Sequence, residues 1–237
     1  MLKQLPNALT SCNLFCGCLG IIQCFEGNLQ KATLFILLAA VFDFFDGFVA
    51  RAVKANSAMG KELDSLADCV SFGALPAFML YKLMLQSTNL ATVSMYLPYS
   101  ALLIAVFSAL RLAKFNIDTR QTDSFIGVPT PADAILIGSF PYLIAENTFF
   151  APFLTNIYVL LGVAICMSYL MMAELPLIAL KFKDFSWKNN QYIYILLVIS
   201  IVMLVFLQFS AVPMIMLLYI ILSVIKNTTK AHLPSGE

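Results

Sequence analysis

The feature that most constrains this chain is a series of apolar stretches that are each long enough to cross a lipid bilayer. A helix rises about 1.5 Å per residue and the hydrocarbon core is about 30 Å thick, so a span needs about 20 residues. Segments of this length satisfy their backbone polar groups in a bilayer only as helices. The eight candidate spans are residues 8–25, 32–53, 62–85, 91–114, 131–146, 152–180, 191–207 and 211–227. We therefore expect an all-α integral membrane protein of about eight transmembrane helices, with residues 1–237 forming a single membrane domain.

Positive charges divide unevenly between the two sides that eight spans define. Of the 14 Lys and Arg residues, only Lys31 and Lys82 fall on one side. Because cytoplasmic loops carry the excess of Lys and Arg, this division predicts cytoplasmic termini and a multi-pass protein of the cell membrane. The residues on the predicted cytoplasmic side are Lys3, Arg51, Lys54, Lys61, Arg111, Lys114, Arg120, Lys181, Lys183, Lys188, Lys226 and Lys230.

Composition excludes several classes of function. The net charge of +1 gives no signature of polyanion binding, so no nucleic-acid partner is expected. The only histidine, His232, lies in the polar tail, which excludes a His-rich zinc site and a His-based catalytic triad. The six cysteines are interpreted as reduced packing residues, because four of them lie in one apolar run. Acid–base chemistry must therefore use carboxylates or lysines.

Acidic residues are concentrated in the second and third candidate spans. Five of the 13 acids lie within 26 residues, and four of these are Asp43, Asp46, Asp64 and Asp68. A carboxylate inside a membrane is costly, so a functional role is the default expectation. Asp43 and Asp46 are three residues apart, and Asp64 and Asp68 are four apart, so each helix presents two carboxylates on one face.

A short polar turn near residues 55–57 would join these two helices into an antiparallel hairpin. Asp46 and Asp64 are about equally far from the turn, and so are Asp43 and Asp68. The four carboxylates are therefore expected at two matching levels, as a cage of oxygen ligands between the second and third helices that opens toward the cytoplasm.

Four carboxylates in a low-dielectric site require cations, and an all-oxygen ligand set favours Mg²⁺ or Mn²⁺. The alternative, that the aspartates only form ion pairs with Arg51 and Lys61, leaves two of the four acids without a counter-charge. Gly47, Ala50 and Gly60 beside the cage would let a ligand approach the backbone, and Arg51 offers a bidentate donor to a phosphate. The same small residues would also allow close helix packing.

Together these residues spell Asp43-x2-Asp46-Gly47-x2-Ala50-Arg51-x8-Gly60-x3-Asp64-x3-Asp68. The pattern resembles the complete signature of the CDP-alcohol phosphotransferase family, with no departure at any defined position. The resemblance implies a membrane enzyme that transfers a phosphatidyl group from CDP-diacylglycerol to an alcohol and releases CMP. It also implies two divalent ions and a homodimer. By resemblance Asp43, Asp46 and Asp64 are metal ligands, Asp68 is both a ligand and the general base, and the CDP-binding residues are Gly47, Ala50, Arg51 and Gly60.

Three further segments are similar to the branch of this family whose acceptor alcohol is serine. They are Pro6-Asn7-x2-Thr10-x2-Asn13-x3-Gly17, Arg111-Leu112-Ala113-Lys114-Phe115-Asn116 and Gly127-Val128-Pro129-Thr130-Pro131. Eight spans fit that branch too, whereas the family core has six. Asn7 and Thr10 are expected to line the nucleotide pocket, with Asn13 as a third candidate, although a helix cap and interhelical hydrogen bonds would explain these residues equally well.

A serine acceptor carries a carboxylate, which needs a cation or a helix N-terminus as its partner. Arg111 and Lys114 lie on the predicted cytoplasmic face, and Thr130 is expected to cap a helix whose N-terminus points there. These three residues are the candidates for acceptor binding. The alternative for the basic residues is a role as topology anchors or lipid-headgroup contacts. Glu174, which lies inside the sixth candidate span, has no assigned role.

Rival functions are another acceptor within the family, an ion-coupled transporter and a purely structural membrane scaffold, and the four clustered aspartates argue against the scaffold. Within the family, the rival acceptors are glycerol-3-phosphate, inositol phosphate and choline, and the phosphorylated ones should demand a denser cluster of Arg and Lys than the fourth span and its loop provide. In another class, an ion-coupled transporter could use intramembrane carboxylates as a relay. A transporter needs access from both sides, whereas the acids of this chain lie only in the predicted cytoplasmic half.

Overall fold

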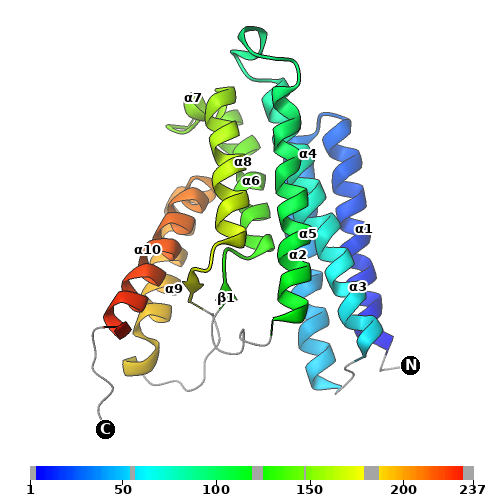
Figure 1. Cartoon of the computed structure of the whole chain (residues 1–237), viewed down its shortest axis with the longest axis vertical. Coiled ribbons are helices and arrows are strands. Elements are labelled where there is room, and N and C mark those ends of the chain that lie inside the picture. The colour runs from blue at the N-terminus through cyan, green and yellow to red at the C-terminus, as the bar shows by residue number, and fades with distance from the viewer. Residues whose placement is uncertain (1–3, 54–56, 119–124, 147, 179–186, 232–237) are drawn as a thin grey trace.

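The structure, a computed structural model, describes residues 4–53, 57–118, 125–146, 148–178 and 187–231, without the side chains of 125, 187–189 and 228–231. It is a bundle of helices with one pairing of two-residue strands (Figure 1). The α-helices are α1 (Leu5–Phe25), α2 (Leu29–Ala52), α3 (Ala58–Asp68), α4 (Leu75–Leu85), α5 (Leu103–Ile117), α6 (Thr130–Ala145), α7 (Ala151–Leu154), α8 (Ile157–Met172), α9 (Trp187–Leu207) and α10 (Ala211–Ala231). The other elements are the π-helical turn η2 (Cys69–Ala74), the 3-10 turns η3 (Leu90–Thr92), η4 (Leu97–Leu102) and η5 (Gln208–Ser210), and the antiparallel strands β1 (Phe125–Ile126) and β2 (Pro176–Leu177).

Five helical runs in the described part of the chain are long and apolar enough to cross a membrane. They are Leu5–Phe25, Leu29–Ala52, Ala58–Leu85, Leu97–Ile117 and Asn190–Asn227, the last of which contains α9 and α10. The helices α6 and α8 are also apolar but have only 16 residues each. These lengths and compositions are those of an integral membrane protein, and the predicted all-helical class is confirmed.

Two predicted spans are wrong at one end. The span 91–114 starts too early, because the helical run begins only at Leu97, where Pro98 fits the first turn of a helix. The span 152–180 is too long, because α8 ends at Met172 and Pro176 lies in β2. Proline lacks a backbone N–H and disfavours helical geometry in the residue before it. Glu174 therefore lies beyond the helix with a 68% exposed side chain, and not inside a span as expected.

Helix starts follow local signals in two cases. Ser57 caps α3 by accepting a hydrogen bond from the Gly60 N–H at 2.9 Å, and Asn156 caps α8 by accepting one from the Tyr158 N–H at 2.9 Å. The helix α6 instead has Pro129 in the cap position and Thr130 as its first residue. Thr130 is therefore not the N-cap that the sequence predicts.

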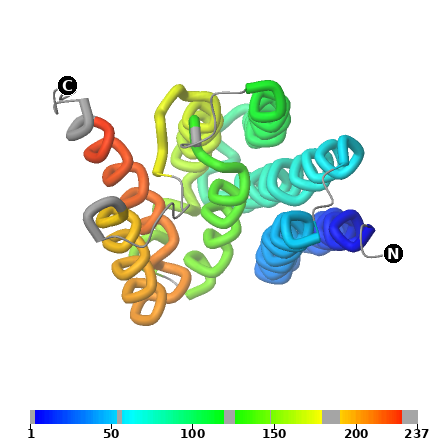
Figure 2. The backbone as a smooth tube through the Cα atoms, turned by 90° about the horizontal axis from the view of Figure 1, so that it is seen from below, coloured from blue at the N-terminus to red at the C-terminus, as the bar shows by residue number. Residues whose placement is uncertain are grey.

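The helix α6 runs through the middle of the bundle. On one side it contacts α2, where Thr33 donates a hydrogen bond to the Gly138 carbonyl at 2.6 Å, and on the other side it contacts α10. Figure 2 shows α1 and α2 on one side of α6 and the α9–α10 pair on the other. A single cluster of buried apolar side chains extends from Cys16 in α1 to Met216 in α10.

The start of α1 and the end of α10 lie at the same end of the bundle, where α2 ends and α3 begins (Figure 1). The short helix α7 and the connection between α4 and α5 lie at the opposite end. Five of the basic residues used for the predicted topology, and residues 55 and 56 of the predicted turn, lie outside the described residues. These basic residues are Lys3, Lys54, Arg120, Lys181 and Lys183.

Candidate active site

Three of the four predicted metal ligands come together in the structure. One carboxylate oxygen each from Asp43, Asp64 and Asp68 lies within 4.8 Å of the other two. Asp43 is on α2, and Asp64 and Asp68 are one turn apart on α3, so the α2–α3 hairpin brings them to one point. This all-oxygen donor set fits a hard divalent cation.

Asp46, the fourth predicted ligand, turns toward α1. The Thr10 hydroxyl donates a hydrogen bond to Asp46 Oδ2 at 2.6 Å, and the Asp46 side chain is only 6% exposed. Asp46 still lines the same cavity as Asp64, so the four carboxylates are treated as one group. We call Asp43, Asp46, Asp64 and Asp68 the carboxylate cluster.

No basic side chain forms a salt bridge with the carboxylate cluster in the part of the chain that the structure describes. Lys61 donates a hydrogen bond to the Asn116 carbonyl at 2.9 Å instead, and Arg51 is exposed. Asp64 Oδ1 is buried and has no hydrogen-bond partner among these residues. Carboxylates this close together cannot all ionise without cations, so the unpartnered oxygen and the absence of ion pairs both fit a metal site.

The helix α1 holds Asp68 from the other side. Asn13, which is fully buried, donates a hydrogen bond from Nδ2 to Asp68 Oδ1 at 3.0 Å, and the Ser71 hydroxyl donates one to the Asn13 carbonyl at 3.0 Å. Gly17 makes this approach possible, because a Cβ there would lie 2.4 Å from Ser71 Oγ. The π-helical turn η2 begins directly after Asp68, and such turns are frequent at functional sites. The sequence suggested Asn13 only for the nucleotide pocket and gave no sign of Ser71 or of the π-helical turn.

A cavity of about 450 Å³ lies between α1, α2 and α3, next to the carboxylate cluster. Five of the six predicted CDP-binding residues line it, namely Asn7, Thr10, Gly47, Ala50 and Gly60. The cavity is also lined by Pro6, Asp46, Ser57, Ala58, Lys61 and Asp64. It therefore joins small residues and a lysine to two members of the carboxylate cluster, a combination that suits a phosphate-containing ligand.

The glycines of the cavity have different roles. A Cβ built on Gly47 meets nothing within 4 Å, so helix packing does not require a glycine there and the space is open to a ligand. A Cβ on Gly60 would lie 3.0 Å from both Asn7 Oδ1 and Ser57 Oγ, so close packing explains that glycine. Arg51, the sixth predicted CDP-binding residue, does not line the cavity, and its contact with a phosphate stays a prediction.

Arg111 approaches the carboxylate cluster from α5. Arg111 is only 7% exposed, and its helix packs against η2, the π-helical turn that begins directly after Asp68. Its Nε has no hydrogen-bond partner in the described part of the chain. A buried cation with an unused donor therefore lies on the α5 side of the site. The small cavity that Arg111 lines shares no residue with the cavity between α1, α2 and α3.

The two other candidates for acceptor binding have different surroundings. Lys114 pairs with Glu174 at 3.6 Å, which ties the end of α5 to the residues after α8. Thr130 is fully buried, and its hydroxyl has no partner among the described residues. The buried carboxylate of Asp133 lies in the same first turn, so the N-terminus of α6 already has an acidic side chain of its own.

The fold and the site together define a class of protein. It is an all-helical membrane protein whose carboxylate cluster and adjoining polar cavity can hold a divalent cation and a polar ligand at one end of the bundle. A family model described as CDP-alcohol phosphatidyltransferase matches residues 3–173. The chain belongs to this family.

Several curated proteins are similar to the chain. The CDP-diacylglycerol–serine O-phosphatidyltransferase of Bacillus subtilis is 38% identical over 143 residues, which is 60% of this chain and 78% of that protein. The protein of the same name from Helicobacter pylori strain J99 is 31% identical over 223 residues, or 93% of this chain and 90% of that protein. An archaetidylserine synthase of Methanothermobacter thermautotrophicus is 33% identical over 165 residues, or 69% of this chain and 66% of that protein.

Proposed function

We propose that this protein transfers the phosphatidyl group of CDP-diacylglycerol to the hydroxyl of L-serine, giving phosphatidylserine and CMP. The observation that carries the proposal is the convergence of Asp43, Asp64 and Asp68 beside a cavity lined by five predicted CDP-binding residues. The names of the similar proteins from B. subtilis and H. pylori support CDP-diacylglycerol and serine as the substrates.

The carboxylate cluster is proposed to hold two Mg²⁺ or Mn²⁺ ions. CDP-alcohol phosphotransferases generally use divalent metals, and the described structure has an acidic cluster that suits them. Such ions, when bound, supply a Lewis acid that polarises the phosphorus under attack and stabilises the phosphate that leaves. Asp43, Asp46 and Asp64 are the proposed ligands, and Asp68 is a fourth.

Asp68 is also the proposed general base. The serine hydroxyl oxygen forms a bond to the phosphorus that carries diacylglycerol, and the bond from this phosphorus to the bridging oxygen of the diphosphate breaks. The bonding electrons leave with CMP, and the hydroxyl proton passes to the Asp68 carboxylate. Asn13 holds Oδ1 of that carboxylate, which fixes the direction in which the base faces.

The substrates are proposed to occupy two sides of the carboxylate cluster. The nucleotide takes the cavity between α1, α2 and α3, where the open space at Gly47 admits it. The carboxylate of serine pairs with Arg111, which forms no salt bridge with the acidic residues that the structure describes. Lys114 and Thr130 complete the proposed acceptor set, with less support, because Lys114 is paired with Glu174.

The proposed topology has eight spans in one membrane domain, with both termini and the active site facing the cytoplasm. Counting α9 and α10 separately and adding α6 and α8 to the long helices gives this number. A helix of 16 residues is about 24 Å long, so the bilayer would have to be thinned around α6 and α8. The homodimer implied by the family resemblance stays a prediction.

The test is release of CMP by the purified protein with CDP-diacylglycerol, Mn²⁺ and one acceptor at a time. Serine is expected to support turnover, and glycerol-3-phosphate, inositol phosphate and choline are not. Turnover with one of the other acceptors but not with serine would contradict the proposed substrate. A lack of CMP release with every acceptor, together with cation flux in vesicles, would favour the transporter.

A pair of variants tests the role of Asp68. Asp68→Asn is expected to lose turnover far more than it loses binding of CDP-diacylglycerol, because the base is removed while most of the pocket remains. The matched control is Glu62→Gln, which changes an exposed acid on the same helix outside the carboxylate cluster. Turnover by Asp68→Asn close to that of Glu62→Gln would remove Asp68 as the base.

A further inference from the structure

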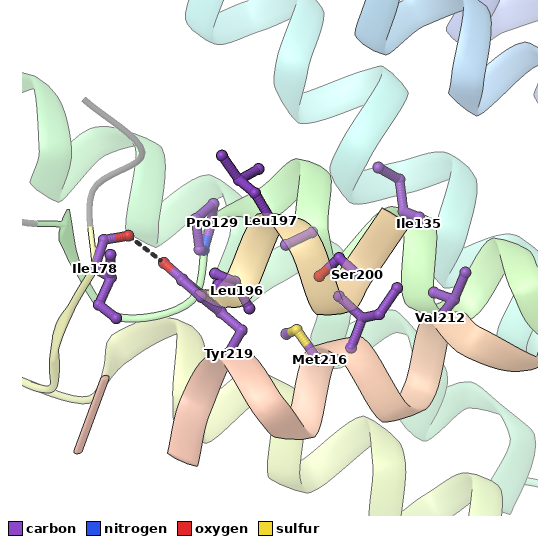
Figure 3. Close-up of a pocket in the computed structure, with 11 residues that line it drawn as sticks. Pro129, Ile135, Ile178, Leu196, Leu197, Ser200, Val212, Met216 and Tyr219 are labelled. Carbon is purple, nitrogen blue, oxygen red and sulfur yellow. Dashed lines mark hydrogen bonds between the residues drawn. The ribbon is translucent and has the colours of Figure 1, made fainter. Parts of the chain in front are cut away.

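A cavity lined almost entirely by apolar side chains lies between α6, α9 and α10. Its volume is about 370 Å³, and 11 residues line it (Figure 3). The only hydroxyls among these residues belong to Ser200 and Tyr219. Tyr219 donates its proton to the Ile178 carbonyl at 3.1 Å at one end of the cavity, and Val212 lies at the other end. Because a buried water needs several polar partners, this cavity does not suit water.

The cavity is open on one side. Eight of the 11 lining residues are half-buried, and the other three are buried. Large exposed apolar side chains adjoin the lining residues, among them Val198 on α9 and Leu217 on α10. Both helices belong to the run Asn190–Asn227, which is long and apolar enough to cross a membrane. The opening therefore faces the hydrocarbon of the bilayer.

The packing of α9 leaves a space to fill. Among the described elements, α9 contacts mainly α10 and η5, whereas α10 contacts α6. The helices α6 and α9 face each other across the cavity, with Ser200 on one wall and Ala132 and Ile135 on the other. Protein interiors are close-packed, and a void deprives the side chains around it of van der Waals contacts. An apolar occupant would restore these contacts.

An apolar chain could come from the substrate lipid or from the surrounding bilayer. The cavity next to the carboxylate cluster lies between α1, α2 and α3 and shares no lining residue with the apolar cavity. Figure 2 shows α1 and α2 on the opposite side of α6 from α9 and α10. A lipid whose headgroup binds at the carboxylate cluster would have to pass α6 to place a chain in the apolar cavity. A lipid of the bilayer enters directly through the opening.

We propose that one acyl chain of a bilayer phospholipid occupies this cavity and packs α9 against α6. The lining residues of α10 extend from Val212 to Tyr219, about 10 Å along the helix, so the cavity takes part of a chain and not a whole lipid. No charged residue lines the cavity, so the headgroup stays outside. The site therefore selects an apolar chain and not a particular headgroup.

The bound chain also supports the connection that follows α8. The helix α10 holds this connection through Tyr219 and through Ser223, whose hydroxyl accepts a hydrogen bond from the Ile178 N–H at 3.1 Å. Ile178 itself lines the cavity. A ligand that binds only the folded state stabilises it, so loss of the chain is expected to lower the free energy of unfolding.

The experiment uses the full-length protein in phosphatidylcholine vesicles that contain a phosphatidylcholine with a diazirine group on one acyl chain. The protein is extracted in a mild detergent and washed before irradiation, so that only retained lipid is crosslinked to it. Labelled peptides are then identified by mass spectrometry. Labels are expected on the residues of α6 and α10 that line the cavity.

Two variants on α9 provide the matched comparison. Ser200→Phe puts a ring into the cavity, whereas Val198→Phe adds the same ring at a position that is 59% exposed and does not line the cavity. Ser200→Phe is expected to reduce the labels in the cavity about tenfold or more, and Val198→Phe to leave them unchanged. Ala132→Leu fills the cavity from the wall of α6 and is expected to act like Ser200→Phe, which keeps the test decisive if Ser200→Phe does not fold.

Thermal unfolding gives a second measurement. Removal of lipid by a harsher detergent should lower Tm of the wild type and of Val198→Phe, and added phosphatidylcholine should restore it. Ser200→Phe should respond to neither treatment, because its own side chain fills the cavity.

Two results would overturn the proposal. One is labelling of the cavity residues that is equal in Ser200→Phe and Val198→Phe, or that is missing in the wild type. The other is displacement of the label by CDP-diacylglycerol together with a raised KM for CDP-diacylglycerol in Ser200→Phe, because the cavity would then hold a chain of the substrate.

Discussion

The hydrogen bond from Asn13 to Asp68 offers a direct test of the active-site geometry. Asn13 is fully buried in α1 and donates to Asp68 Oδ1 at 3.0 Å. Asn13→Leu has a similar size and removes the donor, so Asp68 keeps its place in the chain but loses the contact that orients its carboxylate. A hydrogen bond to a charged group is worth about 1.5 to 3 kcal/mol, so kcat is expected to fall about 10- to 100-fold if the orientation matters most in the transition state.

The control is Ser71→Ala, which removes the hydrogen bond from Ser71 to the Asn13 carbonyl and leaves Asp68 untouched. Both variants loosen the contact between α1 and the helix that carries Asp68, but only Asn13→Leu acts on the Asp68 carboxylate, the proposed base. CMP release under saturating substrates gives kcat, and thermal unfolding in detergent shows whether both proteins fold. If kcat of Asn13→Leu stays within about twofold of wild type, the proposed orientation of Asp68 by α1 is refuted.

Three further predictions concern the cavity, a buried acid and the topology. Gly47→Val should raise the KM for CDP-diacylglycerol about tenfold or more without loss of folded protein, because the valine side chain would enter the open space of the cavity. Gly17→Ala should instead lower the yield of folded protein, because its Cβ would lie 2.4 Å from Ser71 Oγ. Asp133→Asn should raise Tm, because both oxygens of this fully buried carboxylate lack a partner among the described residues. The rise is about 2 to 4 °C for each kcal/mol gained in the free energy of unfolding. A fall in Tm would show that Asp133 makes a stabilising contact. Reporter fusions after Lys230 and within residues 86–90 should report opposite sides of the membrane, and the same side for both would overturn the proposed topology.

The acidic centre is the part of the site that the sequence predicts best. Helical spacing puts Asp64 and Asp68 on one face, and the symmetry of the hairpin brings Asp43 to the same level. Three carboxylate oxygens within 4.8 Å of one another agree with that reasoning. Asp46 departs from it, because Thr10 on a different helix draws its side chain toward α1. Spacing along one helix cannot reveal a partner on another.

The errors in the spans have a similar cause. Hydropathy records that residues 152–180 are apolar but not how their backbone hydrogen bonds are satisfied. The helix α8 ends at Met172, ahead of Pro176, which could not continue it, and the residues that follow pair with β1 and with side chains of α10. Those partners are distant in sequence, so the short strand could not be predicted from the local pattern. The π-helical turn after Asp68 was missed for the same reason, because no local residue type marks it.

The two proposed substrate sides are built from different parts of the chain. The residues that line the nucleotide cavity come from α1, α2, α3 and the cap of α3, all within the family match. The small cavity beside Arg111 is lined by residues of α5, β1 and α8, which also lie within the match. Because the two sides share no lining residue, a substitution on the acceptor side need not disturb the contacts that hold the nucleotide. On the proposed mechanism, the residues around Arg111 can therefore change the affinity for the acceptor while the chemistry at the carboxylate cluster stays the same.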